Sequence, residues 1–437
     1  MDNSTTSIRR STGELDPTFA DNGIFTFTEA IYGFLLVGIG KTVTAQDGKI
    51  LVPAAKKAEL PILESYLLAQ LNADGTPDRS FGTNGSVSGH FVEGKASYGA
   101  STAITREGKI ILSGCFLPEV ATPPQPALAQ FLDTGELDKS FGENGIVRFD
   151  ALLPPPVTDN GNDPEPEPEP PKGGPPDTAA HENSFSITPL PDGKLVFSGR
   201  VNGRNTFMSF LGRLNPDGSL DHSFASKGYV VIVGNPNTVD SHVLQPDGKI
   251  LISGQIEKEA HTTIYVRRYL EDGTLDPTFT FSEQPLKPGI LEGGHIMAIA
   301  LHADGRIILG ANKRYYSGTP WNGVLMCLTS SGAWDSGFNG GQPLEMALGT
   351  TGFRCVLKDI LVDGDGVILL GEMGDIAVAR YFLDGTPDAG FGDRQGWWEY
   401  PGIESYYLVR QDDGKILATS MFSDFQKTVA RFLGEYT

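Results

Sequence analysis

The residue types best suited to holding a ligand lie close together between Asn312 and Asn322, in the stretch NKRYYSGTPWN. Aromatic faces that can stack on a sugar ring or anchor a protein partner alternate there with fixed hydrogen-bonding groups. The candidate side chains are Arg314, Tyr315, Tyr316, Trp321 and Asn322. This mixture predicts a binding site for a glycan or a protein. The alternative, in which the aromatic side chains only fix a loop to its scaffold, stays open.

A second polar group follows another apolar run and consists of Arg200, Asn202 and Arg204. Guanidinium and amide groups recognise carboxylates and hydroxyls through well-directed hydrogen bonds. We therefore interpret these residues as a second part of a ligand-binding surface, with an ordinary polar loop as the alternative.

Three histidines, His181, His242 and His295, each stand near the beginning of a predicted strand. If those strands line a central channel, the imidazoles lie near its mouth and could ligate a metal together. No local ligand spacing supports such a site, so we expect neither a metal nor a cofactor. A hydrolase or lyase that uses these histidines and nearby carboxylates is kept as an alternative function.

Familiar catalytic motifs are missing from the chain: it has no Gly-x-Ser-x-Gly elbow, no His-Glu-x-x-His and no phosphate-binding loop. The run Asp363-Gly364-Asp365-Gly366 looks like part of a calcium loop but lacks its later acidic ligands, and we interpret it as a hairpin turn. Trp397 and Trp398 fall in a predicted strand and are interpreted as packing residues.

Composition narrows the classes of partner. The 437 residues carry 54 acidic and 34 basic side chains and a formal net charge of −20, which disfavours nucleic acid and anionic membranes as partners. Three cysteines without metal-type spacing indicate buried apolar thiols. The N-terminal residues contain no apolar signal region and no run could span a bilayer, so we expect a cytoplasmic protein, with signal-less export left open. We also expect a monomer.

A repeat positions all these residues. Seven copies of the corner Leu-Asp-x-x-Phe, or a close variant, surround Phe19, Phe81, Phe141, Phe224, Phe279, Phe338 and Phe391. Seven tight turns of the type Asp-Gly precede short apolar runs such as KILISG, and the period is roughly 60 residues. An aspartate that occurs seven times is a structural residue, which caps a corner while the phenylalanine anchors it between neighbouring units.

The two ends of the chain complement one another. The N-terminal GIFTF has the character of a fourth strand without its first three, and Thr428–Leu433 is a third strand without a fourth. We therefore predict an all-β, seven-bladed β-propeller with four antiparallel strands per blade, closed when the N-terminal strand completes the last blade. The expected divisions are 8–28 (outer strand of blade 7), 29–92 (blade 1), 93–150 (blade 2), 151–179 (an acidic, Pro-rich insertion), 180–233 (blade 3), 234–282 (blade 4), 283–346 (blade 5), 347–401 (blade 6) and 402–437 (inner strands of blade 7).

The repeat resembles the delta-60 repeat of bacterial proteins. The stretches RRYLEDGTLDPTF at 267–279 and LQPDGKILISG at 244–254 carry the resemblance most clearly. The resemblance covers nearly the whole chain and implies a β-propeller-like fold. It implies no particular activity, cofactor or catalytic residue.

Strand order predicts where a ligand would bind. In a propeller whose strands a to d run from axis to rim, the short a–b and c–d turns share one face, and the irregular b–c and d–a connections share the other. Irregular loops on a rigid scaffold are where binding sites usually lie. We therefore expect a non-enzymatic binding module for a glycan or a protein. A channel-mouth enzyme and a scaffold that uses the Pro-rich insertion are the alternatives.

Overall fold

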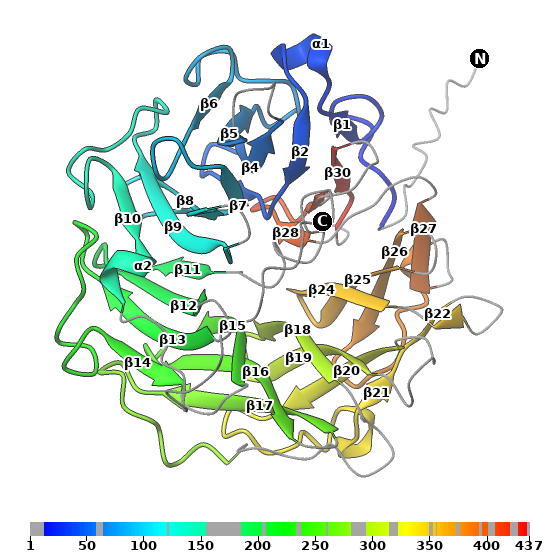
Figure 1. Cartoon of the computed structure of the whole chain (residues 1–437). Helices are drawn as coiled ribbons and strands as arrows, with labels where there is room; N and C mark the ends of the chain where they lie inside the picture. Colours follow the sequence, from blue (N-terminus) through cyan, green and yellow to red (C-terminus); the bar gives the residue numbers. More distant parts are fainter. Residues whose placement is uncertain are drawn as a thin grey trace, which may run out of the picture.

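Seven β-sheets surround a central axis in the structure, which is a computed structural model (Figure 1). It describes residues 13–57, 64–119, 122–153, 185–202, 207–232, 237–258, 261–280, 294–313, 322–348, 353–354, 356–372, 376–392, 396–400, 407–419 and 427–434. The sheets are antiparallel, and six of them consist of consecutive strands that run from the axis to the rim, while the seventh combines strands from the two ends of the chain. The predicted seven-bladed β-propeller is confirmed.

Blades 1 to 3 each have four strands in chain order. Blade 1 contains β2 (Leu36–Ile39), continued by β3 (Val43–Thr44), then β4 (Ile50–Lys56), β5 (Ser65–Leu71) and β6 (Ser86–Gly89). Blade 2 contains β7 (Ser97–Ile104), β8 (Ile110–Phe116), β9 (Gln125–Phe131) and β10 (Ile146–Arg148). Blade 3 contains β11 (Ser186–Pro189), β12 (Leu195–Asn202), β13 (Phe207–Leu214) and β14 (Tyr229–Ile232).

Blades 4 to 6 follow the same order. In blade 4 the described residues give β15 (Asn237–Leu244), β16 (Ile250–Lys258) and β17 (His261–Tyr269), and the place of a fourth strand falls outside them. Blade 5 contains β18 (Gly294–Leu301), β19 (Ile307–Lys313), β20 (Asn322–Leu328) and β21 (Leu344–Glu345). Blade 6 contains β24 (Val356–Asp363), β25 (Gly366–Glu372), β26 (Ile376–Phe382) and β27 (Trp397–Tyr400).

Blade 7 joins the two ends of the chain. Its inner strands are β28 (Tyr407–Arg410), β29 (Ile416–Thr419) and β30 (Thr428–Phe432), and its outer strand is β1 (Ile24–Thr26). β1 pairs with β30 in the register Ile24 to Ala430, and the blue and red strands lie side by side in Figure 1. The N-terminal strand therefore closes the ring, as the complementary ends of the sequence predicted.

Apolar side chains are buried between blades. The described residues form seven apolar clusters, and each cluster joins two neighbouring blades. Second strands supply much of this core, since β8 and β19 are buried along their whole length. A strand packed on both faces needs a continuous apolar run, which explains the KIILSG-like segments.

The repeated corner links each blade to the next. The residue before the corner aspartate forms a bridge to the third strand in all seven corners, including those where Pro77, Trp334 or Pro387 replaces Leu. The corner Phe then lies under the c–d turn of the following blade; a Cβ on Gly75 would stand 2.7 Å from the ring of Phe19. Six described junctions add a backbone hydrogen bond from corner to turn: Ala20 N to Asp74 O, Gly82 N to Thr134 O, Gly142 N to Asp217 O, Ala225 N to Asp272 O, Thr280 N to Ser331 O and Asn339 N to Asp384 O.

The corner aspartates are held by ion pairs and hydrogen bonds. In blade 3, Asp221 accepts from Arg213 Nε at 2.6 Å and lies 2.9 Å from Lys194 Nζ, while its other oxygen caps Ser223. The same arrangement joins Asp276 to Arg268 in blade 4. Because these carboxylates already have partners within the corner, they are structural and not an active site.

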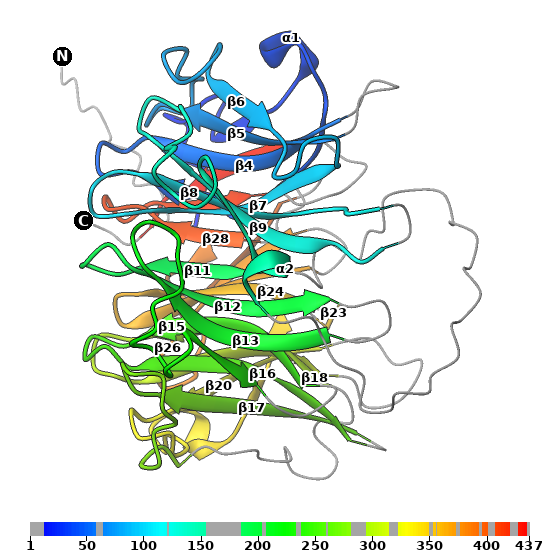
Figure 2. The ribbon, with the colours of Figure 1, turned by 60° about the vertical axis from the view of Figure 1, so that its left-hand side comes forward.

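The two faces of the ring differ. Short a–b and c–d turns project on one side of the blades (Figure 2). The extra elements occur instead in d–a connections: α1 (Glu29–Tyr32), α2 (Phe149–Leu152) and the hairpin of β22 (Ala347–Leu348) and β23 (Phe353–Arg354). One 3-10 turn, η1 (Asn339–Gly341), belongs to a c–d connection. None of the helices in the described parts of the chain has the length and apolarity needed to span a bilayer.

Candidate functional site

The sequence-predicted residues divide into three groups. Arg314, Tyr315, Tyr316, Trp321, Arg204 and His181 lie outside the described residues. For Asn202 and His295 the structure describes the backbone, where Asn202 pairs with Phe207 and His295 pairs with Asn312. Arg200, His242 and Asn322 are described in full, and they occupy two places on the ring.

Asn322 belongs to the stem of the loop between β19 and β20. It pairs with Lys313 in the strand register, and both side chains are directed to the carboxylate of Glu345 on β21. The Nδ2 atom of Asn322 donates to Glu345 Oε2 at 3.2 Å, and the fully buried Lys313 ammonium contacts Oε1. A buried ammonium requires such a partner, so this carboxylate fixes both ends of the loop.

The stem is also tied to blade 6. The Asn312 amide accepts from Leu357 N at 2.7 Å and donates to Leu357 O at 2.8 Å. Both backbone polar groups of Leu357, in the inner strand β24, are therefore hydrogen-bonded to this side chain. Asn312 is itself buried. Residues 314–321 are therefore carried by a stem with buried polar anchors on two blades.

Arg200 and His242 lie in the seam between blades 3 and 4. Arg200 is near the b–c end of β12, and its charge acts on the carboxyl group of Asp240 in β15. Asp240 also receives a hydrogen bond from Thr238, while its Oδ2 atom is buried without a partner. Burial raises the pKa of Asp240 to about 7, against the opposing effects of Thr238 and Arg200. The seam thus holds a carboxyl group that can be protonated near neutral pH.

His242 is enclosed in the same seam. Its Nε2 atom is 2.8 Å from Thr188 Oγ1 and its Nδ1 atom is 2.7 Å from Ser198 Oγ. Burial lowers the pKa of His242 to about 4, so the imidazole is neutral at pH 7. Both ring nitrogens are used by hydroxyl groups, and the histidine is buried in the interface between the two blades. The described residues contain no group of three or more His, Cys, Asp or Glu arranged to hold a metal ion.

Sequence reasoning missed Asp240. It lies at a β-bulge between Val239 and Ser241, where the register with β16 shifts. The corresponding bulges of blades 2, 5 and 6 contain Ala100, Met297 and Lys358. The sequence contains no signal for Asp240, because β15 reads NTVDSHVL and contains several other polar residues, and nothing in the sequence marks a bulge.

Two other runs singled out in the sequence are structural. Trp397 and Trp398 lie in β27 and pack against the clusters on the two sides of blade 6. Asp363 and Asp365 flank a hairpin turn and pair with arginines: Arg410 Nε is 3.1 Å from Asp363, and Arg380 is 2.8 Å from Asp365. Cys115 and Cys327 are buried free thiols.

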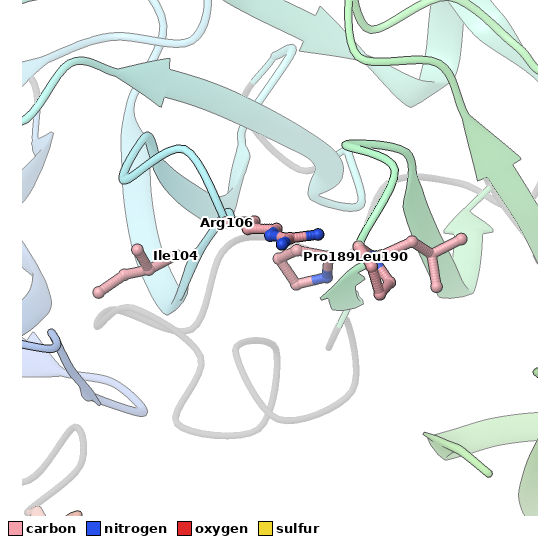
Figure 3. Close-up of a pocket in the computed structure, with 5 residues that line it drawn as sticks. Ile104, Arg106, Pro189 and Leu190 are labelled. Atoms are coloured by element: carbon pink, nitrogen blue, oxygen red, sulfur yellow. The ribbon is translucent and has the colours of Figure 1, made fainter. Parts of the chain in front are cut away.

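A hollow on the opposite face lies between the a–b turns of blades 2 and 3 (Figure 3). It is lined by Ile104, Arg106, Pro189, Leu190 and Pro191. Arg106 is its one charged residue and is exposed, so the hollow lacks the convergent polar groups of an active site.

Comparison with known proteins agrees with the fold. Residues 107–141, 190–224, 245–279 and 360–391 match the family described as "Domain of unknown function (DUF5122) beta-propeller". Each match begins at or before an a–b turn and ends at a corner Phe, namely Phe141, Phe224, Phe279 or Phe391. The chain is thus a β-propeller repeat protein. The comparison with curated proteins returns no match.

Solved structures with similar architecture have varied functions. Drosophila Semaphorin 1b, extracellular domains 1-2, aligns with a TM-score of 0.51 and 10% identity over 97% of this chain and 88% of that chain. The β-propeller domain of the Trilobed protease from Pyrococcus furiosus aligns with a TM-score of 0.48 and 10% identity over 92% of this chain and 95% of that chain. A polysaccharide lyase, an ulvan lyase, aligns with a TM-score of 0.48 and 9% identity over 92% of this chain and 94% of that chain. These similarities concern the fold alone, so function must be argued from the residues of this chain.

Proposed function

We propose that the protein is a non-enzymatic binding module that holds a glycan or a protein on the face formed by its b–c and d–a connections. The observation that carries the proposal is the stem under residues 314–321, where Lys313 and Asn322 share the Glu345 carboxylate and Asn312 is bonded to β24. A loop with a rigid base loses less conformational entropy on binding. Its sequence contains the aromatic and arginine residues that dominate binding energy at interfaces.

The repeated charged residues support this choice of face by elimination. Corner aspartates and their Arg and Lys partners are used to join strands within a blade and blades to one another. What differs from blade to blade lies in the b–c and d–a connections, and differences on a fixed scaffold are the usual source of specificity. We further propose that the repeat is of the delta-60 type.

The test combines a glycan array with capture of proteins from the native cell, using the wild-type chain and two variants. Trp321→Ala removes the largest aromatic of the loop, and Arg106→Ala removes an exposed side chain on the opposite face. We expect Trp321→Ala to weaken retention of the identified ligand by tenfold or more, about 1.4 kcal/mol, and Arg106→Ala to leave it unchanged. Equal retention by all three proteins would place the site elsewhere.

A second function, catalysis at the seam of blades 3 and 4, is favoured by one observation. Asp240 has a pKa of about 7 and an unpartnered buried oxygen, which suits a general acid at neutral pH. Turnover of a polysaccharide by the purified protein, lost in Asp240→Asn while the melting temperature is kept, would decide for a hydrolase or lyase. Turnover that persists in this variant would exclude Asp240 as the acid.

A further inference from the structure

The connection between β1 and β2 carries an unusual apolar surface. Leu35 is 50% exposed, and it follows the half-buried Phe34. The other large apolar side chains that are exposed among the described residues, Leu132 and Leu275, each stand in a c–d connection of the repeat. We call Phe34, Leu35 and the adjacent Lys56 and Lys57 the α1 knob, because Phe34 and Leu35 follow the short helix α1, which lies at the edge of the ring (Figure 1).

Well-defined contacts hold the base of the knob in place. The ring of the buried Tyr32 stacks on Phe27 at 5.5 Å between centroids, and Arg79 donates to the Ile31 carbonyl at 3.2 Å. Gly33 ends α1 with a positive φ of 78°, and its amide donates to Glu29 O at 2.7 Å. The exposure of Leu35 therefore belongs to a fixed surface and not to a frayed end.

Two lysines border the apolar residues. The Lys56 ammonium is 4.8 Å from the centroid of the Phe34 ring, and Lys57 N donates to Leu35 O at 2.9 Å. No described carboxylate lies within ion-pair distance of either ammonium group, although the chain has 54 acidic residues. The knob thus combines an exposed leucine with two cations in a protein of net charge −20.

We propose that the α1 knob binds an acidic peptide segment of a partner protein. An apolar side chain of the peptide covers Leu35, and its carboxylates face Lys56 and Lys57. Complementary charge gives orientation and association rate, while the covered leucine supplies apolar burial. Two lysines are too few to hold a nucleic acid or an anionic membrane against the overall negative charge. This surface is in blade 1 and does not depend on the proposed loop in blade 5.

The test measures fluorescence anisotropy of two labelled ten-residue peptides with the full chain. One peptide has a Leu-Phe pair flanked by glutamates, and the other has glutamines in their place. We expect saturable, micromolar binding of the acidic peptide, and binding about tenfold weaker for the glutamine peptide. Absence of saturable binding of the acidic peptide would overturn the proposal.

Matched variants locate the contact. Leu35→Ser should weaken binding of the acidic peptide about tenfold. Leu275→Ser, the same change at a residue that is 56% exposed on the other face, should leave this binding unchanged. Lys56→Glu with Lys57→Glu should abolish binding, and Arg106→Glu should preserve it. Wild-type affinity in Leu35→Ser would contradict the proposal. Tighter binding after deletion of residues 163–170, the sequence DPEPEPEP, would also overturn it, because the chain's own acidic segment would then be the occupant.

Discussion

A corner aspartate stabilises the protein only while it is charged. Hydrogen bonds from Ser223, Lys194 and Arg213 outweigh the effect of burial and lower the pKa of Asp221 below its usual 3.8. A lowered pKa in the folded state means that the stabilisation is present above pH 4 and is lost as the pH falls further. The pKa values of the corner carboxyl groups of Asp16, Asp78, Asp138 and Asp276 are also lowered, so acid should loosen several blades together.

Removing that carboxylate tests the structural role of the corner. Asp221→Ala leaves the charge of the buried Arg213 without its carboxylate partner and should lower the free energy of unfolding by about 3 to 5 kcal/mol. The control is Asp192→Ala in the same blade, a side chain that is 59% exposed, which should cost less than about 1 kcal/mol. Urea unfolding at pH 7 measures both. Equal stability of the two variants would show that the corner network is not a main source of stability.

Asp240 should destabilise the fold at alkaline pH. Its pKa is raised in the folded state, so its favourable contribution is complete below pH 4 and is lost as the pH rises through about 7. Asp240→Asn should therefore stabilise the protein at pH 8 by about 1 to 2 kcal/mol, allowing for screening of a partly exposed residue, and should change little at pH 4.

His242 changes the stability in the opposite direction as the pH falls. Its folded pKa of about 4 favours the neutral ring, so stability is lost as the pH falls from 6.5 toward 4. In the wild type the two groups oppose each other over that range, and in Asp240→Asn the loss on acidification should be steeper. Thermal unfolding of both proteins from pH 4 to 8 measures these slopes. Parallel curves for the two proteins would refute the assignment to Asp240, and no loss of stability in Asp240→Asn between pH 6.5 and 4 would refute the assignment to His242.

At the scale of elements, the contact between a corner Phe and the next turn can be isolated with two glycines. Gly75 and Gly33 both have positive φ, 85° and 78°, but an added Cβ meets the Phe19 ring at Gly75 and nothing within 4 Å at Gly33. Gly33→Ala should lower the free energy of unfolding by about 1 kcal/mol, because alanine disfavours this backbone conformation. Gly75→Ala should lower it by about 1 to 3 kcal/mol more, because the added Cβ also overpacks against the ring. If Gly75→Ala lowers the free energy of unfolding no more than Gly33→Ala does, the contact between the corner Phe and the next turn does not hold neighbouring blades together.

The strands could be predicted from the sequence because the same pattern occurs seven times. Apolar runs after each Asp-Gly turn specified the second strands, and the complementary ends specified the pairing of β1 with β30. The seam was not predictable, since Arg200 is on β12 of blade 3 while Asp240 and His242 are on β15 of blade 4, and these strands meet only through the stacking of two blades. The bulge at Asp240 depends on tertiary packing that no local pattern records. The predicted residues of the Asn312–Asn322 loop are placed only at its stem.

At the scale of the whole molecule, β1 closes the ring. Deletion of residues 1–27 removes the partner of β30, the Phe19 anchor and the Asp16 partner of Arg431. We expect a lower melting temperature and concentration-dependent association through the exposed edge of β30. A peptide of residues 13–27 added in trans should reverse this association, as measured by light scattering. A truncated protein that melts like the wild type would contradict closure by this strand.

The central claim is that the two faces of the ring have different roles, one structural and one for binding. Hydrogen–deuterium exchange on the full chain, with and without the ligand identified by array or capture, tests it most directly. We predict slower exchange at the b–c and d–a connections, including the ends of β19 and β20, and unchanged exchange in the a–b and c–d turns. Protection confined to the a–b and c–d turns would contradict the account.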